Sequence, residues 1–240
     1  MMSVSVMGIV NVTPDSFSDG GKYFLAEEAV RRAKNLVDEG ASIIDVGGES
    51  TRPGSEPLTW EEEWARVEPV LCELVPALDG KARISIDTYH PETAERSLAA
   101  GVRILNCVDS QAVPAMLEFL ADSPQLELVA PVASRAAIPP EMMPRVYLDP
   151  MIGFGTTREE DLALLKSVRE LSSSARVLVG ASRKRIVKKL TGEKVTGKNL
   201  GGNLGIALWC AMNGAAVLRV HDVRETVQAL KVFATLIPLF

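Results

Sequence analysis

Polar side chains follow most of the short apolar runs of this chain, and their types suit a small polar ligand. They are Asn11, Asp45, Asp87, Asn106 and Asp149, then Ser182 with Lys184, and Arg219 with His221. Carboxylates and amides match the donor and acceptor edge of a heterocycle, whereas arginine, histidine and asparagine match an anion. A single polar residue after an apolar run is ordinary loop chemistry. Together, these positions predict one site for a ligand that is part heterocycle and part anion.

Two glycine-rich stretches lie among these positions. Residues 45–54 read DVGGESTRPG, where Thr51 and Arg52 offer donors to an anion, and residues 149–155 read DPMIGFG, with Phe154 between two glycines. Glycines allow sharp turns and a close approach of the main chain to a flat ligand, although ordinary turns remain the alternative. Residues 192–199 (GEKVTGKN) resemble a phosphate loop but lack its final hydroxyl and follow a basic helical stretch instead of a strand. We therefore reject a phosphate loop there.

Short β-branched runs alternate with longer amphipathic stretches, which is typical of βα units around a parallel sheet. Strands are expected at residues 4–12, 42–46, 83–87, 103–106, 126–132, 145–148, 176–179 and 217–220. Helices are expected at residues 24–39, from about 59, and at 91–100, 114–120, 158–171, 183–190, 199–213 and 224–237. Eight strands favour a single (β/α)8 TIM barrel domain over residues 1–240, since about 250 residues is typical of that fold. An open doubly wound sheet is the alternative and usually has fewer strands.

Prolines predict two irregularities in this pattern. Residues 133–144, after the fifth strand, carry Pro139, Pro140 and Pro144, so a shortened or missing helix is expected there. Pro69 and Pro76 are expected to kink or shorten the helix that begins near residue 59. His90 precedes a helix and is expected at the surface.

The composition excludes several classes of protein. The 240 residues carry a net charge of −5, whereas a protein that coats nucleic acid needs a basic face. Three scattered cysteines and two histidines favour neither a disulfide framework nor a zinc site. The N-terminus lacks the basic region of a signal peptide, and the longest apolar region, residues 204–218, is too short to span a bilayer. We expect a soluble cytoplasmic protein with no nucleic-acid or membrane partner.

Seven stretches, in order along nearly the whole chain, resemble the dihydropteroate synthase family. They are residues 8–19 (GIVNVTPDSFSD), 44–57 (IDVGGESTRPGSEP), 84–90 (ISIDTYH), 101–106 (GVRILN), 148–155 (LDPMIGFG), 180–186 (GASRKRI) and 219–223 (RVHDV). The resemblance implies a (β/α)8 barrel that joins p-aminobenzoate to 6-hydroxymethyl-7,8-dihydropterin pyrophosphate, giving 7,8-dihydropteroate and pyrophosphate for folate biosynthesis. It also implies competition by sulfonamides and a homodimer.

The resemblance further implies roles for single residues. The pterin would be held by Asp87, Asn106, Asp149, Phe154 and Lys184, of which Asp87, Asp149 and Lys184 would be catalytic. Pyrophosphate would be bound by Asn11, Thr51, Arg52, Arg219 and His221, with Mg²⁺ near Asn11. The p-aminobenzoate pocket would be formed by Phe17, Pro53, Phe154 and Ser182.

The chain departs from the family pattern mainly around the pterin. Cys107 stands in place of the usual aspartate, Met151 of a glycine, Thr156 of a lysine and Val220 of a threonine. A pterin-binding paralogue without synthase activity and a pterin-dependent methyltransferase therefore remain alternatives. The pyrophosphate residues are retained, and a methyl donor brings no pyrophosphate for Arg52, Arg219 and His221 to bind.

Overall fold

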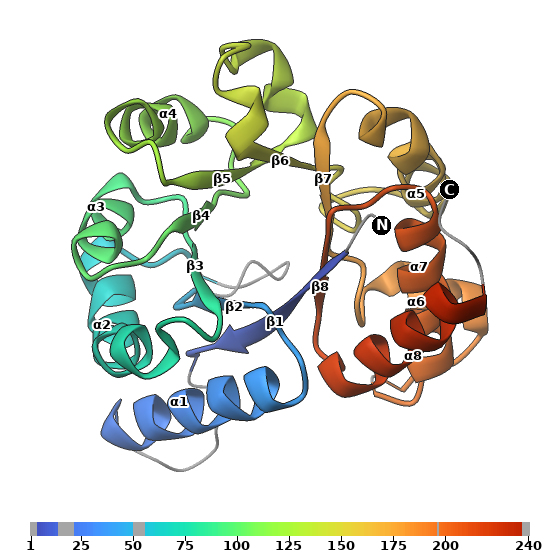
Figure 1. The fold of residues 1–240 in the computed structure, drawn as a ribbon, viewed down its shortest axis with the longest axis horizontal. Coiled ribbons are helices and arrows are strands. Elements are labelled where there is room, and N and C mark those ends of the chain that lie inside the picture. Colours follow the sequence, from blue (N-terminus) through green and yellow to red (C-terminus); the bar gives the residue numbers. More distant parts are fainter. Residues whose placement is uncertain (1–3, 14–21, 50–55, 196, 237–240) are drawn as a thin grey trace.

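Eight parallel strands close into a barrel in the computed structural model, which describes residues 4–13, 22–49, 56–195 and 197–236 (Figure 1). The strands are β1 (Ser5–Asn11), β2 (Ile43–Gly47), β3 (Arg83–Asp87), β4 (Ile104–Asn106), β5 (Glu127–Pro131), β6 (Val146–Asp149), β7 (Arg176–Val179) and β8 (Val217–Val220). Each strand pairs with the next along the chain, and β8 pairs with β1. The predicted barrel is confirmed, and the open doubly wound sheet is excluded.

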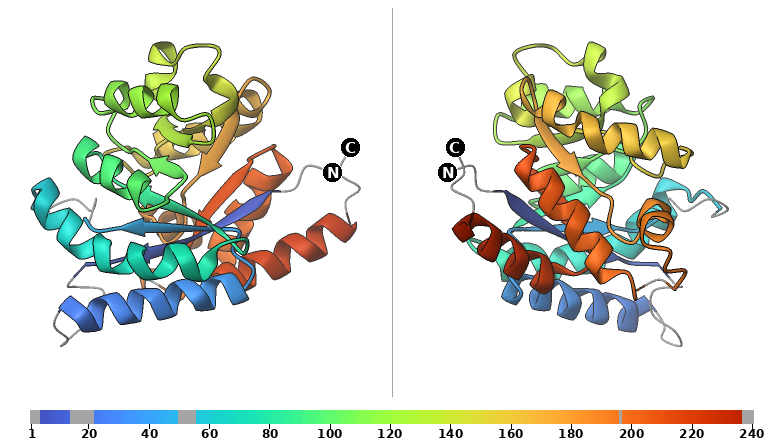
Figure 2. Two further views of the ribbon diagram at one scale, coloured as in Figure 1. Left: turned by 60° about the vertical axis from the view of Figure 1, so that its left-hand side comes forward. Right: turned by 90° about the vertical axis from the view of Figure 1, so that its right-hand side faces the viewer.

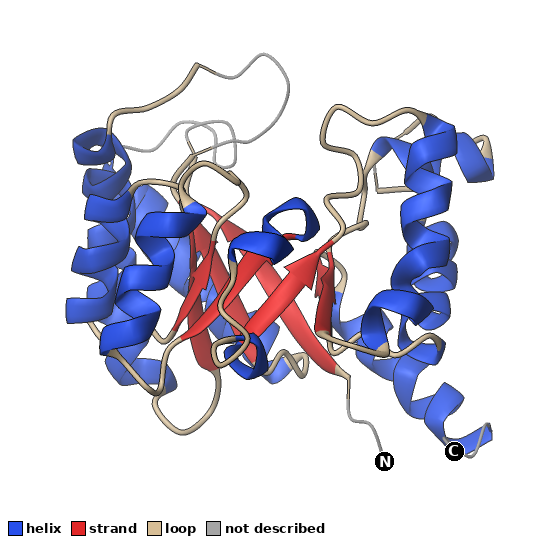
Figure 3. Cartoon of the chain, turned by 90° about the horizontal axis from the view of Figure 1, so that it is seen from above, coloured by secondary structure: helices blue, strands red, loops and turns tan. Residues whose placement is uncertain are grey.

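Helices surround the sheet and cover its outer face (Figures 2 and 3). They are α1 (Lys22–Asp38), α2 (Trp60–Leu78), α3 (Pro91–Ala99), α4 (Val113–Asp122), α5 (Arg158–Ser172), α6 (Arg185–Thr191), α7 (Leu200–Met212) and α8 (Val223–Leu236). The large hydrophobic core lies between these helices and the strands. Within the described ranges, no helix is long and apolar enough to cross a membrane.

The fifth βα unit lacks a full helix, as the prolines predict. Two short 3₁₀ segments, η2 (Val132–Ala137) and η3 (Met143–Arg145), take its place. The expectation that Pro69 or Pro76 shortens α2 is wrong, because the helix continues through both prolines to Leu78, whereas the expected kink stays a prediction. Thr59 and Glu62 form a capping box at its start, and an apolar face from Val67 to Leu78 is buried along it. Tertiary packing of that face outweighs the hydrogen bonds lost at the two prolines.

The barrel interior is sealed below the site by two layers of side chains. At the amino-terminal end of the strands, Glu127 pairs with Arg83 and with Arg176, and the Arg176 guanidinium lies 3.9 Å from the centre of the Tyr147 ring. The layer above is apolar and consists of Met7, Ile43, Ile104, Val129, Tyr147, Leu178 and Val217. Among the described residues, the polar groups of the barrel interior that can reach a ligand lie at the carboxyl ends of the strands, where barrels place their chemistry.

Gly202 on α7 lies where this helix packs closely against α6. A Cβ atom at residue 202 would lie 2.4 Å from Thr191 Cγ2 and 2.8 Å from Val187 Cγ1 on α6. Gly202→Ala is therefore expected to destabilise the protein by about 2 kcal/mol, a typical cost of overpacking, measured by urea denaturation. At Gly201, an added Cβ has no described atom within 4 Å, so Gly201→Ala serves as the control and should leave stability unchanged or slightly higher. Equal losses in both variants would contradict this packing argument.

Candidate active site

The register of the first four strands places three predicted site residues in one row. Asn11 pairs with Gly47, Gly47 with Asp87, and Asp87 with Asn106 across β1 to β4. Gly47 leaves open space between its neighbours, because a Cβ atom there would lie 3.4 Å from Asp87 Cβ and 3.9 Å from Asn11 Oδ1. The amide of Asn11 and the carboxylate of Asp87 thus flank a gap at the barrel mouth.

Arg219 crosses this mouth from β8 and pairs with two carboxylates. Its Nε donates to Asp45 Oδ2 at 2.6 Å, and its Nη2 donates to Asp87 Oδ2 at 2.5 Å. Asn106 Nδ2 also donates to Asp45 Oδ2, at 3.1 Å. Burial raises the pKa of Asp87 to about 7, although Arg219 opposes that shift. Burial alone would lower the pKa of Arg219, but Asp45 and Asp87 outweigh it and raise that pKa, so the guanidinium stays charged.

Lys184 approaches the same mouth from the far side, at the start of α6. Its Nζ donates to the Ile152 carbonyl at 2.6 Å and lies 4.3 Å from the centre of the Phe154 ring. Burial lowers the pKa of Lys184 to about 8, against the opposing effect of Asp149. Burial also raises the pKa of Asp149, which Lys184 opposes. Lys184 and Asp87 thus titrate close to neutral pH, as is common at functional sites.

The turn after β6 has a tightly bonded backbone. The Gly153 N–H donates to Asp161 Oδ1 at 2.8 Å and to Thr156 Oγ1 at 3.1 Å, and the Thr156 hydroxyl donates to the same Asp161 oxygen at 2.5 Å. Met151 has φ of 62°, a left-handed conformation that favours glycine, and its N–H donates to Asp149 Oδ1 at 2.7 Å. Two departures from the family pattern, Met151 and Thr156, are therefore built into the turn that presents Ile152 and Phe154 to Lys184.

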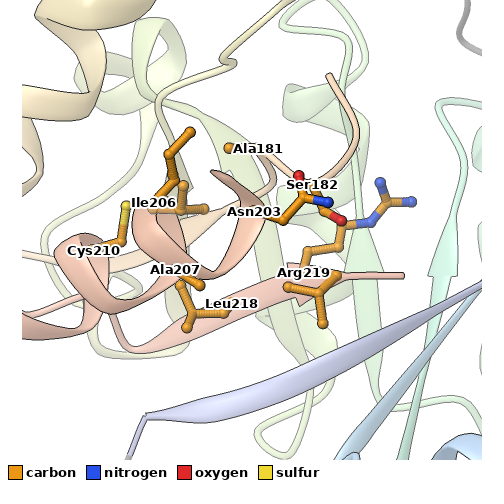
Figure 4. Close-up of a pocket in the computed structure, with 10 residues that line it drawn as sticks. Ala181, Ser182, Asn203, Ile206, Ala207, Cys210, Leu218 and Arg219 are labelled. Carbon is orange, nitrogen blue, oxygen red and sulfur yellow. The ribbon is translucent and has the colours of Figure 1, made fainter. Parts of the chain in front are cut away.

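Ser182 and His221 lie side by side after β7 and β8. The Ser182 hydroxyl oxygen accepts from the His221 N–H at 3.3 Å and lies 3.1 Å from His221 Nδ1. A cavity behind them, between β7, β8 and α7, measures about 10 Å³ (Figure 4). That volume suits about one water molecule, so this cavity is too small for either substrate.

The structure brings most of the predicted site residues to one rim of the barrel. Nine of them lie at the carboxyl end of a strand or in the loop that follows it: Asn11, Asp87, Asn106, Asp149, Phe154, Ser182, Lys184, Arg219 and His221. Phe17, Thr51, Arg52 and Pro53, predicted for p-aminobenzoate and pyrophosphate, lie outside the described residues.

The expectation that His90 is a surface residue is wrong. Its side chain is 18% exposed, and its Nε2 lies 3.6 Å from Glu49 Oε2. The ring also packs against Tyr89, whose hydroxyl donates to Glu49 at 2.8 Å. His90 is drawn inward because Glu49, at the end of the β2 turn, offers its imidazole a carboxylate partner.

Asp45, predicted at the site without an individual role, is completely buried and pairs with Arg219. Two polar residues near the site were not predicted from the sequence. Asp161 lies beneath the β6 turn, and Asn203 on α7 contacts the turn after β7. Both come from helices, and helical periodicity alone does not show which loop a polar helix residue contacts.

The carboxylates, amide, lysine and arginine at the carboxyl rim of this barrel suit a heterocycle with an anionic tail, and the chain belongs to a class of pterin-binding enzymes. The sequence profile described as "Pterin binding enzyme" matches residues 7–134 and 124–221. Dihydropteroate synthase from Neisseria meningitidis serogroup B is 37% identical over 96% of this chain and 92% of its own length. The enzyme from Escherichia coli K12 is 36% identical over 95% of this chain and 89% of its own length.

Solved structures give the same relationship. Xanthomonas albilineans dihydropteroate synthase with 4-aminobenzoic acid superposes with a TM-score of 0.88 at 36% identity, covering 97% of this chain and 93% of that one. The Yersinia pestis enzyme, solved as a sulfonamide drug complex, gives a TM-score of 0.83 at 32% identity, covering 97% and 94%. This chain belongs to the dihydropteroate synthase family, whose members are transferases.

Proposed function

We propose that this chain joins p-aminobenzoate to 6-hydroxymethyl-7,8-dihydropterin pyrophosphate, forming 7,8-dihydropteroate and pyrophosphate. The observation that carries the proposal is the convergence of Asp87, Asn106, Asp149, Lys184 and Arg219 on one closed rim above an apolar layer. In the reaction, the bond between the pterin methylene carbon and the pyrophosphate oxygen breaks. The aniline nitrogen forms the new C–N bond to that carbon and releases one proton.

The two carboxylates stabilise the positive charge that develops on the pterin methylene as pyrophosphate departs. Asp87 and Asp149 are fixed before the reaction by Arg219 and by the Met151 N–H, so little reorganisation is needed at the moment of bond breaking. Asn106 and Lys184 supply donors to the heterocycle. The aniline nitrogen is already nucleophilic at neutral pH, so orientation is the main requirement for it.

Arg219 links the pterin and pyrophosphate subsites. Its guanidinium donates to oxygen atoms of Asp45 and Asp87. The N–H groups of Arg219 that these two pairs do not use would donate to the departing oxyanion, while Asp87 stays held. His221 and Asn11 complete the described part of the pyrophosphate subsite, and Thr51 and Arg52 are assigned to it on the family pattern.

The p-aminobenzoate subsite is assigned to Ser182 and the Phe154 ring, with Phe17 and Pro53 from the family pattern. The Ser182 hydroxyl lies at the turn into α6, where main-chain N–H groups can receive a carboxylate. Sulfonamides carry a similar anionic group on an aniline ring and would compete at the same subsite.

Magnesium fits the site only as a partner of pyrophosphate. Asn11 offers one amide oxygen, and no group of three potential metal-ligating side chains occurs in the part of the chain that the structure describes. Mg²⁺ commonly binds through one or two protein oxygens together with substrate phosphates and water. When bound near Asn11, the ion would neutralise part of the charge on the leaving pyrophosphate.

The pKa values of Asp87 and Lys184 predict a narrow pH optimum. Asp87 loses its proton near pH 7, and Lys184 loses its proton near pH 8. The productive state has an anionic Asp87 and a cationic Lys184. We expect kcat/KM to fall about tenfold per pH unit below the first pKa and above the second, because kcat/KM reports groups of the free enzyme. A flat profile between pH 5.5 and 9.5 would contradict these assignments.

A coupled assay of pyrophosphate release with both substrates tests the proposal. Turnover that requires p-aminobenzoate supports the synthase. Pterin binding by calorimetry without release would indicate a paralogue that only binds, and release of product from a methylated pterin donor would indicate a methyltransferase.

We propose that the chain forms a homodimer through α7 and α8. Large apolar side chains are exposed on both helices, including Trp209 at 44%, Met212 at 49% and Val232 at 61%. Exposed apolar groups gathered on neighbouring helices are typical of an interface. Sedimentation velocity should show a dimer for the wild type and a monomer for Trp209→Arg, whereas Leu190→Arg on α6 serves as the control. A wild-type monomer at all concentrations would contradict this assignment.

The cytoplasm is the compartment that we propose for this reaction. Cys72, Cys107 and Cys210 are all free, which suits a reducing environment.

A further inference from the structure

The turn between β7 and α6 has a conformation that its own residues disfavour. Arg183 has φ of 59°, in the left-handed region that a residue with a side chain rarely adopts. Ser182 and Lys184, which are both assigned to substrate, flank it. Something outside the turn must therefore hold Arg183 in place.

Asn203 on α7 supplies that support. Its Oδ1 accepts from the Arg183 N–H at 3.0 Å, and its Nδ2 donates to Asp222 Oδ2 at 3.3 Å. The Arg183 side chain closes a ring by pairing with Asp222. One amide thus connects the turn after β7 to the residue that follows His221. Figure 4 shows Asn203 beside Ser182 at the end of the cavity near Arg219.

The two partners allow only one orientation of the Asn203 amide. A main-chain N–H can only donate, and a carboxylate can only accept. An aspartate at this position would place its charge against Asp222, and an alanine would leave both partners without the amide. The side chain is 9% exposed, so water replaces it poorly.

The backbone beneath Asn203 is also fixed. Its N–H donates to the Asn199 carbonyl at 3.0 Å, and Gly202 lets this turn of α7 lie directly against Thr191 and Val187 of α6. The Ser182 hydroxyl in turn contacts both the main chain and the ring of His221. A displacement of Asn203 would therefore move Ser182 and His221 together.

We propose that Asn203 is a positioning residue that fixes Ser182 relative to His221 and so sets the affinity for p-aminobenzoate and for pyrophosphate. This inference rests on the proposed function, since it concerns the substrates of that reaction. Asn203 acts through its neighbours, without contact with the reacting atoms.

Steady-state kinetics of Asn203→Ala test the inference. We expect the KM for p-aminobenzoate to rise about tenfold, as for the loss of one well-placed hydrogen bond, with kcat within about threefold of the wild type. Asn203→Asp should show the same defect at pH 8.5. At pH 6 its buried carboxyl group, facing Arg183 and Asp222, regains a proton and can donate again, so activity relative to the wild type should recover at least about fivefold. A defect caused only by lost stability would not recover in this way.

Asn199→Ala is the matched control. It makes the same change one turn earlier on the same helix terminus, at a side chain that is 2% exposed and has no hydrogen-bond partner among the described residues. It should leave both KM values within about twofold of the wild type. Unchanged KM values in Asn203→Ala, or an equal rise in Asn199→Ala, would overturn the inference.

Calorimetry with inorganic pyrophosphate separates this result from the proposed function. If the wild type releases no pyrophosphate, the proposed function fails, yet an affinity lowered about tenfold in Asn203→Ala would still support the positioning role through His221. Equal affinities in the two proteins would count against that role.

Discussion

Asp87→Asn is expected to lower kcat/KM about a thousandfold, as for the loss of one preorganised electrostatic group in a buried site. Asparagine keeps the size of the side chain but removes the charge that we propose stabilises the pterin methylene. It also offers Arg219 Nη2 an amide oxygen in place of the carboxylate that now accepts at 2.5 Å. Pyrophosphate release by the purified variant is the measurement. Asp122→Asn makes the same change at an exposed position on α4 and should retain full activity.

Asp87→Asn should raise the stability of the protein at high pH, although it lowers activity. Burial raises the pKa of Asp87 to about 7 from an ordinary value near 3.8, so the folded state favours the protonated carboxyl. That contribution to stability is fully present at low pH and is lost as the pH rises through 7. Asp87→Asn removes the cost of the buried charge, so its Tm relative to the wild type should be higher at pH 8 than at pH 5. A relative Tm that does not change between these pH values would contradict the raised pKa.

The sequence predicted the barrel and the residues of its rim because both depend on local signals. Strand length, helix spacing and the polar residue after each apolar run are all visible within ten residues, and closure of a parallel barrel then brings the strand ends together. Asn11, Asp87 and Asn106 could be assigned to one site for this reason, even though 95 positions separate the first from the last.

Pairing across the mouth could not be predicted in the same way. Whether Arg219 faces a ligand or a carboxylate depends on the registers of β8 with β1 and of β1 with β2, and its contact with Asp45 joins residues 174 positions apart. Helix residues are harder still: Asp161 and Asn203 reach the site because of how α5 and α7 are rotated against the barrel. Local rules also predicted that Pro69 and Pro76 could shorten α2. The helix continues through both because its buried face packs against the barrel, which is a tertiary effect.

Lys184→Met should also lower kcat/KM about a thousandfold, because it removes the cation that interacts with Asp149 and Asp87, the carboxylates we propose to be catalytic, while it keeps the aliphatic stem. The ammonium now donates to the Ile152 carbonyl and lies over the Phe154 ring. Lys184 is the main group that lowers the pKa of Asp149 against the effect of burial, so that pKa should rise further without the ammonium. The pterin should then bind more weakly, because the Lys184 donor is lost and a larger fraction of Asp149 is protonated.

Calorimetry and kinetics together distinguish this effect from a general loss of structure. Burial lowers the pKa of Lys184 to about 8, so the charged ammonium reduces stability below that pH. Lys184→Met should therefore unfold at a temperature no lower than the wild type at pH 7, even as turnover disappears. Lys189→Met removes the same charge from an exposed position on α6 and should keep both turnover and pterin affinity. A kcat/KM of Lys184→Met equal to that of the wild type would show that Lys184 has no catalytic role. A large drop in Tm would indicate a structural role instead.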